Sequence, residues 1–119
     1  MQNKKNLSER LLDFAASSIK LTLKLKRTAA GRYVANQLMR AATSSGANYE
    51  EACGAESRAD FIHKMQLVLK ELRESLYWLK LIEGTNLISN SQLQGLVDEA
   101  AELTKIVAKS VITAKGERK

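Results

Sequence analysis

The sequence predicts an all-α fold, an antiparallel up-down-up-down four-helix bundle with short loops, as a single domain over residues 1–119. Proline is absent and glycine occurs only six times, a composition that favours long uninterrupted helices. Apolar residues recur every three or four positions, which is the period of an amphipathic helix. Only short polar breaks separate the periodic segments, and short connections make consecutive helices antiparallel.

We expect helices at about residues 7–26, 28–53, 58–84 and 90–114, with frayed chain ends. Side chains that accept hydrogen bonds from free helix N–H groups mark the starts, and left-handed or flexible residues mark the ends. The expected starts are Asn6 or Ser8, Thr28, Ser57, and Ser89 or Ser91, and the expected ends are Gly54, Gly84 and Asn86. The expected core stripe is Leu7, Leu11, Phe14, Ser18, Leu21 and Leu25, then Val34, Leu38, Ala41, Ser45 and Ala52, then Phe61, Met65, Val68, Leu69, Leu72, Leu76 and Leu79, and finally Leu93, Leu96, Ala100, Leu103, Val107 and Val111.

No pattern in the sequence is typical of catalysis or metal binding. A di-metal helical bundle needs two inward carboxylate–histidine pairs, whereas His63 is the only histidine and lies off the apolar stripe of its segment. Asp60, three residues earlier, is explained by its place in the capping signal that follows Ser57. Cys53 falls at the end of a helix, which is a poor setting for a reactive thiolate. We therefore expect no enzyme activity, no metal and no cofactor.

The expected location is the cytoplasm. A single cysteine allows no intrachain disulfide, as is usual in a reducing compartment. No apolar run approaches the roughly 20 residues of a membrane-spanning helix, and no signal-peptide core stands out. We therefore expect no membrane partner.

Basic residues are concentrated in the first third of the chain. Residues 1–40 hold nine Lys or Arg side chains against two acidic ones, a charge of +7, while the whole chain carries +6. Such a surface attracts the phosphates of RNA or DNA. The candidate contacts are Lys20, Lys24 and Arg27 on one face of the first segment, and Arg32 and Arg40 on a polar face of the second. The alternative is that the cations at the end of the first segment only complement its helix dipole.

Apolar residues exceed what one bundle can bury. Leu12, Ile19 and Leu23 widen the apolar arc of the first segment, and Leu67 and Trp78 lie eleven residues, or three turns, apart on the third. Large exposed apolar patches mark interfaces. The candidate oligomer contacts are Leu12, Ile19, Leu23, Leu67, Trp78 and Leu81. We expect a closed homo-oligomer, the alternative being that Trp78 merely closes one end of the bundle.

The run from Met39 to Gly54, followed by Ser57 to Phe61, resembles bacterial four-helix bundle proteins encoded by intervening sequences in 23S ribosomal RNA genes. The signature residues Asn48, Glu51, Asp60 and Phe61 match, whereas Ser45, Gly46, Tyr49, Glu50 and Ala52 depart from the family pattern. The resemblance implies a homopentamer with a central pore. Similar pentamers, the accessory proteins of diversity-generating retroelements, bind nucleic acid and a reverse transcriptase. We expect the signature residues to be structural, with Asn48 and Glu51 fixing the junction of the second and third helices.

Two functions follow from these features. The leading hypothesis is a non-enzymatic oligomeric bundle that binds RNA or DNA by phosphate contacts through its basic surface. The alternative is a protein-interaction scaffold, such as an accessory subunit of a nucleic-acid enzyme, with no direct nucleic-acid role.

Overall fold

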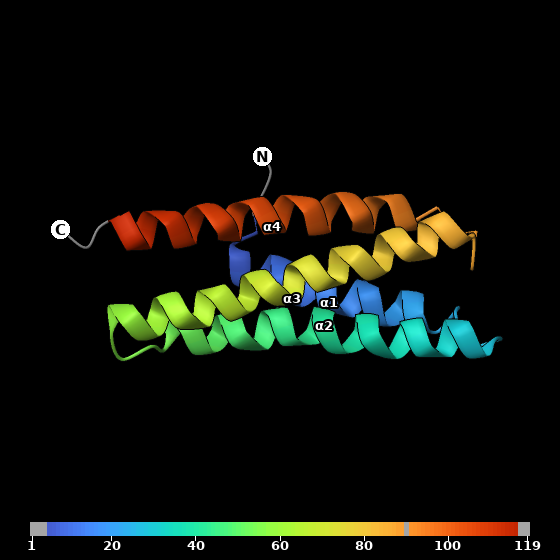
Figure 1. Cartoon of the computed structure of the whole chain (residues 1–119), viewed down its shortest axis with the longest axis horizontal. Coiled ribbons are helices and arrows are strands. Elements are labelled where there is room, and N and C mark those ends of the chain that lie inside the picture. Colours follow the sequence, from blue (N-terminus) through green and yellow to red (C-terminus); the bar gives the residue numbers. More distant parts are fainter. Residues whose placement is uncertain (1–4, 90, 117–119) are drawn as a thin grey trace.

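The computed structural model describes residues 5–89 and 91–116, and in this part of the chain it contains four helices and no strand. The helices are α1 (Leu7–Thr22), α2 (Ala29–Cys53), α3 (Arg58–Thr85) and α4 (Leu93–Gly116). Each runs antiparallel to the one before it (Figure 1). The predicted all-α four-helix bundle is therefore confirmed. The chain ends that we expect to be frayed, residues 1–4 and 117–119, lie outside the described residues.

Most helix ends lie where side-chain capping predicts them. Asn6 starts α1 by accepting a 2.8 Å hydrogen bond from the Glu9 N–H, and the Glu9 carboxylate accepts a 3.1 Å bond from the Asn6 N–H. At the starts of α2 and α3 the Thr28 side chain accepts from the Gly31 N–H and the Ser57 side chain accepts from the Asp60 N–H. These three N-terminal caps satisfy N–H groups that have no partner inside the helix. Asn86 ends α3 in the left-handed conformation, with φ of 53°.

Two expected boundaries are wrong. α1 ends at Thr22 rather than near residue 26, because the chain then tightens into a turn in which the Leu25 N–H donates to the Thr22 carbonyl at 3.0 Å. Leu25 stays buried, and its carbonyl oxygen lies only 1.9 Å from where a Cβ on Gly31 would stand. Only glycine permits this approach. α4 begins at Leu93 rather than near residue 90, and residue 90 itself lies outside the described residues.

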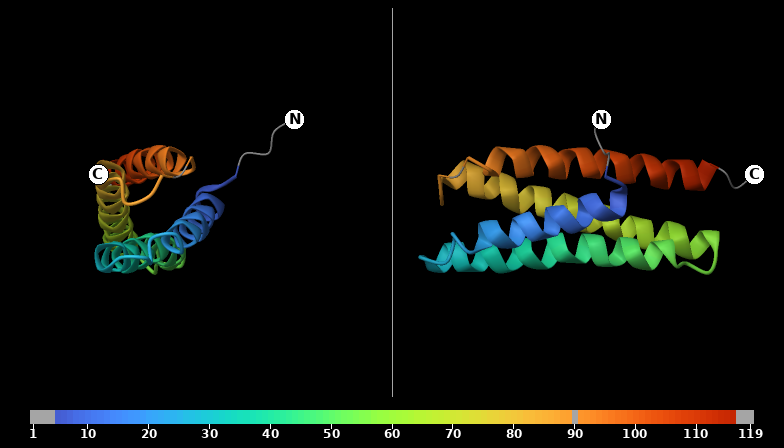
Figure 2. Two further views of the ribbon diagram at one scale, coloured as in Figure 1. Left: turned by 90° about the vertical axis from the view of Figure 1, so that its right-hand side faces the viewer. Right: turned by 180° about the vertical axis from the view of Figure 1, so that it is seen from behind.

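The bundle is least closed between α1 and α4. α2 packs on α3, α3 on α4 and α1 on α2. Of the four pairs of neighbouring helices, α1 and α4 have the fewest contacts. α1 has 16 residues against 28 in α3, and it begins part-way along the bundle (Figure 1). Seen from the end, α1 and α4 are the neighbours that lie furthest apart (Figure 2). The Arg10 guanidinium bridges them to Glu99 at 2.7 and 3.0 Å, and this hydrogen bond raises the pKa of Arg10.

Most residues of the expected core stripe are buried. Every stripe position that we expect on α2 and α4 is buried, as are Leu11 to Leu25 of the first stripe. On α3 the expectation is partly wrong, because Phe61, Leu69 and Leu76 are only half-buried. The buried positions that were not expected there are Ile62, Ser75 and Ile82. α3 packs on both α2 and α4, so its buried arc is wider than a single stripe. No helix in the described part of the chain is long and apolar enough to cross a membrane.

Candidate nucleic-acid interface

A cleft lies at the end of the bundle where the α1–α2 loop and the α3–α4 connection meet, on the right in Figure 1. It has a volume of about 790 Å³. One wall is the loop from residue 23 to residue 28, and the other is the segment from residue 86 to residue 89. The residues that line it are Leu23, Lys24, Leu25, Lys26, Arg27, Thr28, Asn86, Leu87, Ile88 and Ser89. We call it the basic cleft.

The cations of the basic cleft have no acidic partner in the part of the chain that the structure describes. Lys24, Lys26 and Arg27 are exposed, and within the described residues no carboxylate forms an ion pair with them. α2 begins beside them with no acidic residue in its first turn, so the positive end of its dipole adds to the same field. Three like charges this close in sequence repel one another, and a bound anion relieves that repulsion.

The loop that carries these cations is held in one conformation. The close contact between Gly31 and the Leu25 carbonyl fixes it against the first turn of α2. The Arg32 guanidinium also donates a 3.1 Å hydrogen bond to the Lys26 carbonyl oxygen. Arg32 is therefore tied to the loop although it belongs to α2. A site whose cations are already in place loses less conformational entropy when an anion binds.

The five predicted contacts do not form one surface. Lys24 and Arg27 line the basic cleft and Arg32 adjoins it. Lys20 lies in α1 and lines a different groove, towards α4, which also holds Asp13 and Glu99. The expected helical face of Lys20, Lys24 and Arg27 does not exist, because α1 ends at Thr22. Sequence reasoning does not select Lys26, because in a continuous helix it would lie on the opposite side from Lys24, about 200° further round the helix axis.

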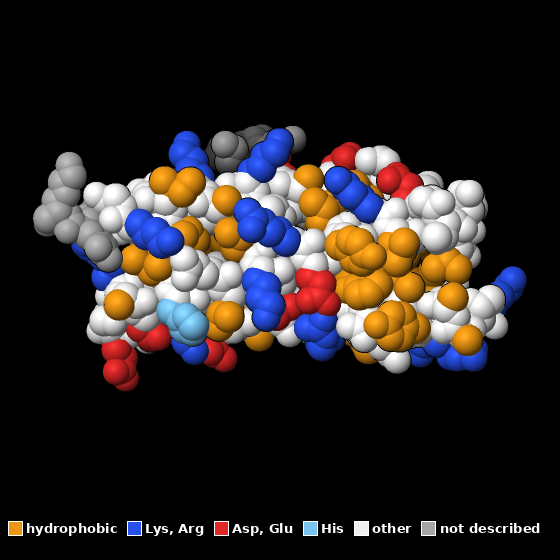
Figure 3. Space-filling model, in the orientation of Figure 1, with side chains coloured by type: hydrophobic (Ala, Val, Ile, Leu, Met, Phe, Trp, Pro, Cys, Tyr) orange, Lys and Arg blue, Asp and Glu red, His pale blue; other side chains and the backbone are white. Residues whose placement is uncertain are grey.

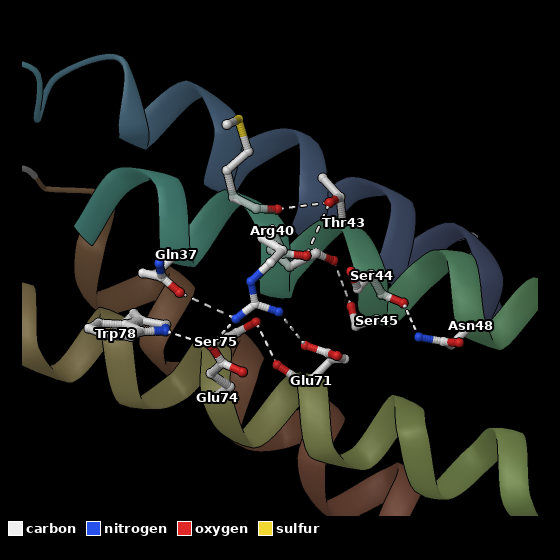
Figure 4. A network of polar contacts seen from close by, with 12 residues as sticks. Gln37, Arg40, Thr43, Ser44, Ser45, Asn48, Glu71, Glu74, Ser75 and Trp78 are labelled. Atoms are coloured by element: carbon white, nitrogen blue, oxygen red, sulfur yellow. Dashed lines mark hydrogen bonds and ion pairs between the residues drawn. The ribbon is translucent and has the colours of Figure 1, made fainter. Parts of the chain in front are cut away.

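Arg40 is placed among carboxylates instead (Figure 4). Its Nη1 lies 3.4 Å from Glu71 Oε1, and its Nη2 is paired with Glu74 Oε2. Glu74 Oε2 also accepts a 3.1 Å hydrogen bond from the Trp78 indole N–H. The guanidinium therefore joins α2 to α3, and its charge is balanced within the bundle.

Two of the predicted oligomer contacts form an apolar groove between α1 and α2. Leu12, which is 69% exposed, and Ile19 line it on the α1 side. Thr43, Gly46, Ala47 and, at one end, Glu50 form the α2 side of a groove of about 630 Å³. Leu23 is 61% exposed but lines the basic cleft rather than this groove.

The other predicted oligomer contacts lie on α3. Leu67, Trp78 and Leu81 are half-buried. The Trp78 ring packs edge-on against Tyr33 of α2 and Tyr77, with centroids 6.0 and 5.0 Å apart. Both tyrosines are more than half exposed, at 59% and 58%. Figure 3 shows hydrophobic side chains gathered over α3 near the end that carries the basic cleft. Sequence reasoning does not select Tyr33, because its contact with Trp78 depends on how α2 and α3 align.

The family-signature residues make contacts that support a structural role. The Asn48 amide donates to the Ser44 carbonyl at 3.0 Å within α2, rather than across the helix junction. Glu51 does span α2 and α3, since it accepts a 2.8 Å hydrogen bond from Lys64, and this bond raises the pKa of Lys64. The Asp60 N–H donates to the Ser57 hydroxyl in the cap, while Phe61 packs on the core.

Other groups with possible chemistry lie away from the basic cleft. Among the described residues, no three His, Cys, Asp or Glu side chains gather as metal ligands would. His63 is exposed on α3, and Cys53 is an exposed free thiol at the end of α2. Burial raises the pKa of Tyr49, which contacts this cysteine, to about 12. The basic cleft is therefore the candidate site, because it groups three cations that form no ion pair within the described residues.

The chain is similar to known proteins over most of its length. The sequence profile of the 23S rRNA-intervening sequence protein family matches residues 4–109. A solved structure of a Bacteroides thetaiotaomicron protein of unknown function, from the S23 ribosomal protein family, is 33% identical and superposes with a TM-score of 0.80. The match covers 89% of this chain and 98% of that one. No curated protein matches the sequence. The resemblance predicted from Asn48, Glu51, Asp60 and Phe61 is confirmed: the chain belongs to the 23S rRNA-intervening sequence protein family.

Proposed function

We propose that this protein is a non-enzymatic oligomeric bundle that binds RNA or DNA through phosphate contacts at the basic cleft. The observation that carries the proposal is the set of three cations, Lys24, Lys26 and Arg27, that share one cleft and have no acidic partner among the described residues. Arg32 supplies a fourth cation at the margin. Unpaired cations on a fixed loop suit phosphate oxygens, which accept charge-assisted hydrogen bonds.

Phosphate binding of this kind depends steeply on salt. Each cation that neutralises a phosphate releases counterions, so the logarithm of the affinity falls linearly with the logarithm of the salt concentration. About four contacts predict a slope near −3, and a loss of roughly 50- to 150-fold in affinity between about 50 and 200 mM salt. Fluorescence anisotropy with labelled oligonucleotides measures this slope directly. Absence of binding at about 20 mM salt would overturn the proposal.

Charge reversal in the basic cleft tests the site itself. The Lys24→Glu/Arg27→Glu variant is expected to bind more than about tenfold more weakly and to lose about two from the magnitude of the salt slope. Both residues are exposed, so the fold should tolerate the change. Lys105→Glu/Lys109→Glu on α4 makes the same change in net charge at exposed positions away from the cleft. An equal loss in both variants would show that only net charge matters and that the cleft is not the site.

We also propose that the bundle forms a closed homo-oligomer, with the pentamer as the state implied by the family resemblance. The exposed apolar side chains of Leu12 and Ile19 support this, because they border a groove whose floor includes small residues such as Gly46 and Ala47, and such a groove can receive another chain's side chains. Light scattering should give a multiple of the 13.2 kDa chain mass, and Leu12→Glu/Ile19→Glu should lower it. The matched control is Ile112→Glu on α4, which is 70% exposed. A monomer in the unmodified protein would overturn this part.

A protein-interaction scaffold is the second candidate function. The cluster of Tyr33, Tyr77 and Trp78 favours it, because exposed aromatic side chains are typical anchors of protein interfaces. Under this function Tyr33→Ala/Tyr77→Ala abolishes capture of a partner protein that survives nuclease treatment. The same variant leaves oligonucleotide affinity unchanged. If this variant instead binds oligonucleotides more weakly and still captures the partner protein, the scaffold function is contradicted.

We propose that the protein is located in the cytoplasm. The single cysteine, Cys53, is a free exposed thiol, which a reducing compartment maintains. Cell fractionation followed by immunodetection tests this placement, and recovery outside the cytoplasmic fraction would contradict it.

A further inference from the structure

We propose that the basic cleft accommodates an unpaired nucleotide of a single strand, with its phosphates on the cationic wall and its base on the opposite wall. This inference rests on the proposed function and names the class of nucleic acid that the same site takes. Its basis is that the two walls differ in chemistry. The loop wall carries Lys24, Lys26 and Arg27, whereas the opposite wall carries an amide, two aliphatic side chains and a hydroxyl from residues 86–89.

The apolar side chains in the cleft suit the face of a base. Leu23 projects from the loop and is 61% exposed, although it is a large aliphatic side chain. Leu87 and Ile88 face it from the other wall, and both are half-buried against the core. The flat face of a base that is not stacked in a duplex is removed from water when it lies against such aliphatic side chains. A paired base already has both faces covered by its neighbours.

Asn86 is placed to bind the edge of a base. It lies in the lining of the cleft, exposed, and the left-handed backbone at φ of 53° that ends α3 fixes where it lies. A side-chain amide has both a donor and an acceptor, which is the pairing that base edges offer. Ser89 adds a hydroxyl beside it. Neither group is required for phosphate binding alone.

The dimensions of the site suit a short stretch of one strand. The three cations lie within residues 24–27, a stretch whose ends are at most about 11 Å apart even when fully extended. Neighbouring phosphates of one strand therefore lie within reach of these side chains. The cleft volume of about 790 Å³ lies in the range of small-molecule pockets, about 300–1,000 Å³.

The test compares strands that have the same phosphates and different bases. Oligouridine and oligothymidine of about twelve nucleotides, a matched duplex, and an abasic strand of the same length are titrated by anisotropy at about 50 mM salt. The single strands are expected to bind at least about fivefold more tightly than the abasic strand, and more tightly than the duplex despite its higher charge density.

Two substitutions, one on each wall, test the proposed base contacts without touching the cations. Leu23→Ser and Asn86→Gly together should remove the preference for the single strand over the abasic strand, with the salt slope unchanged because no phosphate contact is lost. Both positions are exposed, and glycine suits the left-handed backbone of residue 86. Ile112→Ser is the matched control, since it also removes an exposed aliphatic side chain, and it should change nothing.

The outcomes separate this inference from the proposed function. If no strand and no duplex binds, the proposed function fails and the inference fails with it. If the duplex or the abasic strand binds as tightly as the normal single strand, phosphate binding stands and the unpaired-nucleotide inference is overturned. This comparison of strands uses the unmodified protein, so it decides the question even if a variant fails to fold.

Discussion

The basic cleft and Arg40 are two cationic regions of one chain, and they differ in whether carboxylates balance their charge. In the cleft, Lys24, Lys26 and Arg27 share a loop with no acidic partner among the described residues. Arg40 lies between Glu71 and Glu74 and contributes to the contact between α2 and α3. Exposure alone does not separate them, since all four side chains are exposed. The difference lies in whether the neighbouring part of the chain carries carboxylates within reach of the cation.

This comparison separates a basic side chain whose charge is balanced inside the bundle from basic side chains that are candidates for binding a ligand. The carboxylates that pair with Arg40 belong to Glu71 and Glu74, which lie 31 and 34 residues later in the chain. Both are on α3, which packs against α2. The cleft cations come from a loop whose neighbour across the bundle end is a segment with no acidic residue. The same +7 stretch of sequence thus contributes cations both to ion pairs within the bundle, such as those of Arg10 and Arg40, and to one candidate site.

The largest expected effect comes from Gly31→Ala, which disturbs the loop without changing any charge. An alanine Cβ would lie 1.9 Å from the Leu25 carbonyl oxygen, so the loop must move away from α2. We expect a loss of about 1–3 kcal/mol in the free energy of unfolding. Oligonucleotide affinity should fall as well, because the cations lose their fixed positions. Urea denaturation and anisotropy titration measure the two effects.

Gly95→Ala is the matched control for this substitution. Nothing lies within 4 Å of a Cβ at that position in α4, so alanine should raise the free energy of unfolding by about 0.5–1 kcal/mol through its higher helix propensity. Its oligonucleotide affinity should not change. Wild-type affinity in a folded Gly31→Ala protein would mean that loop position does not matter, and the comparison would lose its structural basis.

The second prediction releases Arg40 from its carboxylates. Glu71→Gln/Glu74→Gln removes two negative charges and keeps an oxygen that can accept the Trp78 indole hydrogen bond. Arg40 lies eight residues beyond Arg32, about 12 Å along α2, so a strand leaving the cleft along this helix can reach it. We expect roughly three- to tenfold tighter binding and a salt slope steeper by about one.

Glu56→Gln/Glu102→Gln is the control, because both carboxylates are exposed and neither pairs with Arg40. A similar gain in this control would assign the effect to net charge. A gain with no change in slope would contradict a new phosphate contact at Arg40.

Sequence patterns predict the parts of this molecule that depend on neighbours close in the chain. The Thr28 and Ser57 caps lie three residues from the N–H groups that they bind, and the buried stripe of α4 follows from helical period alone. The predicted end of α1 is wrong because Leu25 continues the apolar period although the chain has already left the helix, and its carbonyl oxygen lies close against Gly31 of the next helix. Lys26 and the Arg40 pairing could not be predicted, because each depends on where another element lies.

The smallest expected effect is that of Arg40→Gln on binding. Since Glu71 and Glu74 already balance its charge, removing it should change oligonucleotide affinity by less than about twofold, although the net charge falls by one. The partly exposed ion pair should contribute about 0.2–1 kcal/mol to the free energy of unfolding. Lys24→Gln makes the same change in charge inside the cleft and should weaken binding severalfold. Equal losses in the two variants, measured side by side at low salt, would mean that pairing does not govern which cations hold the ligand.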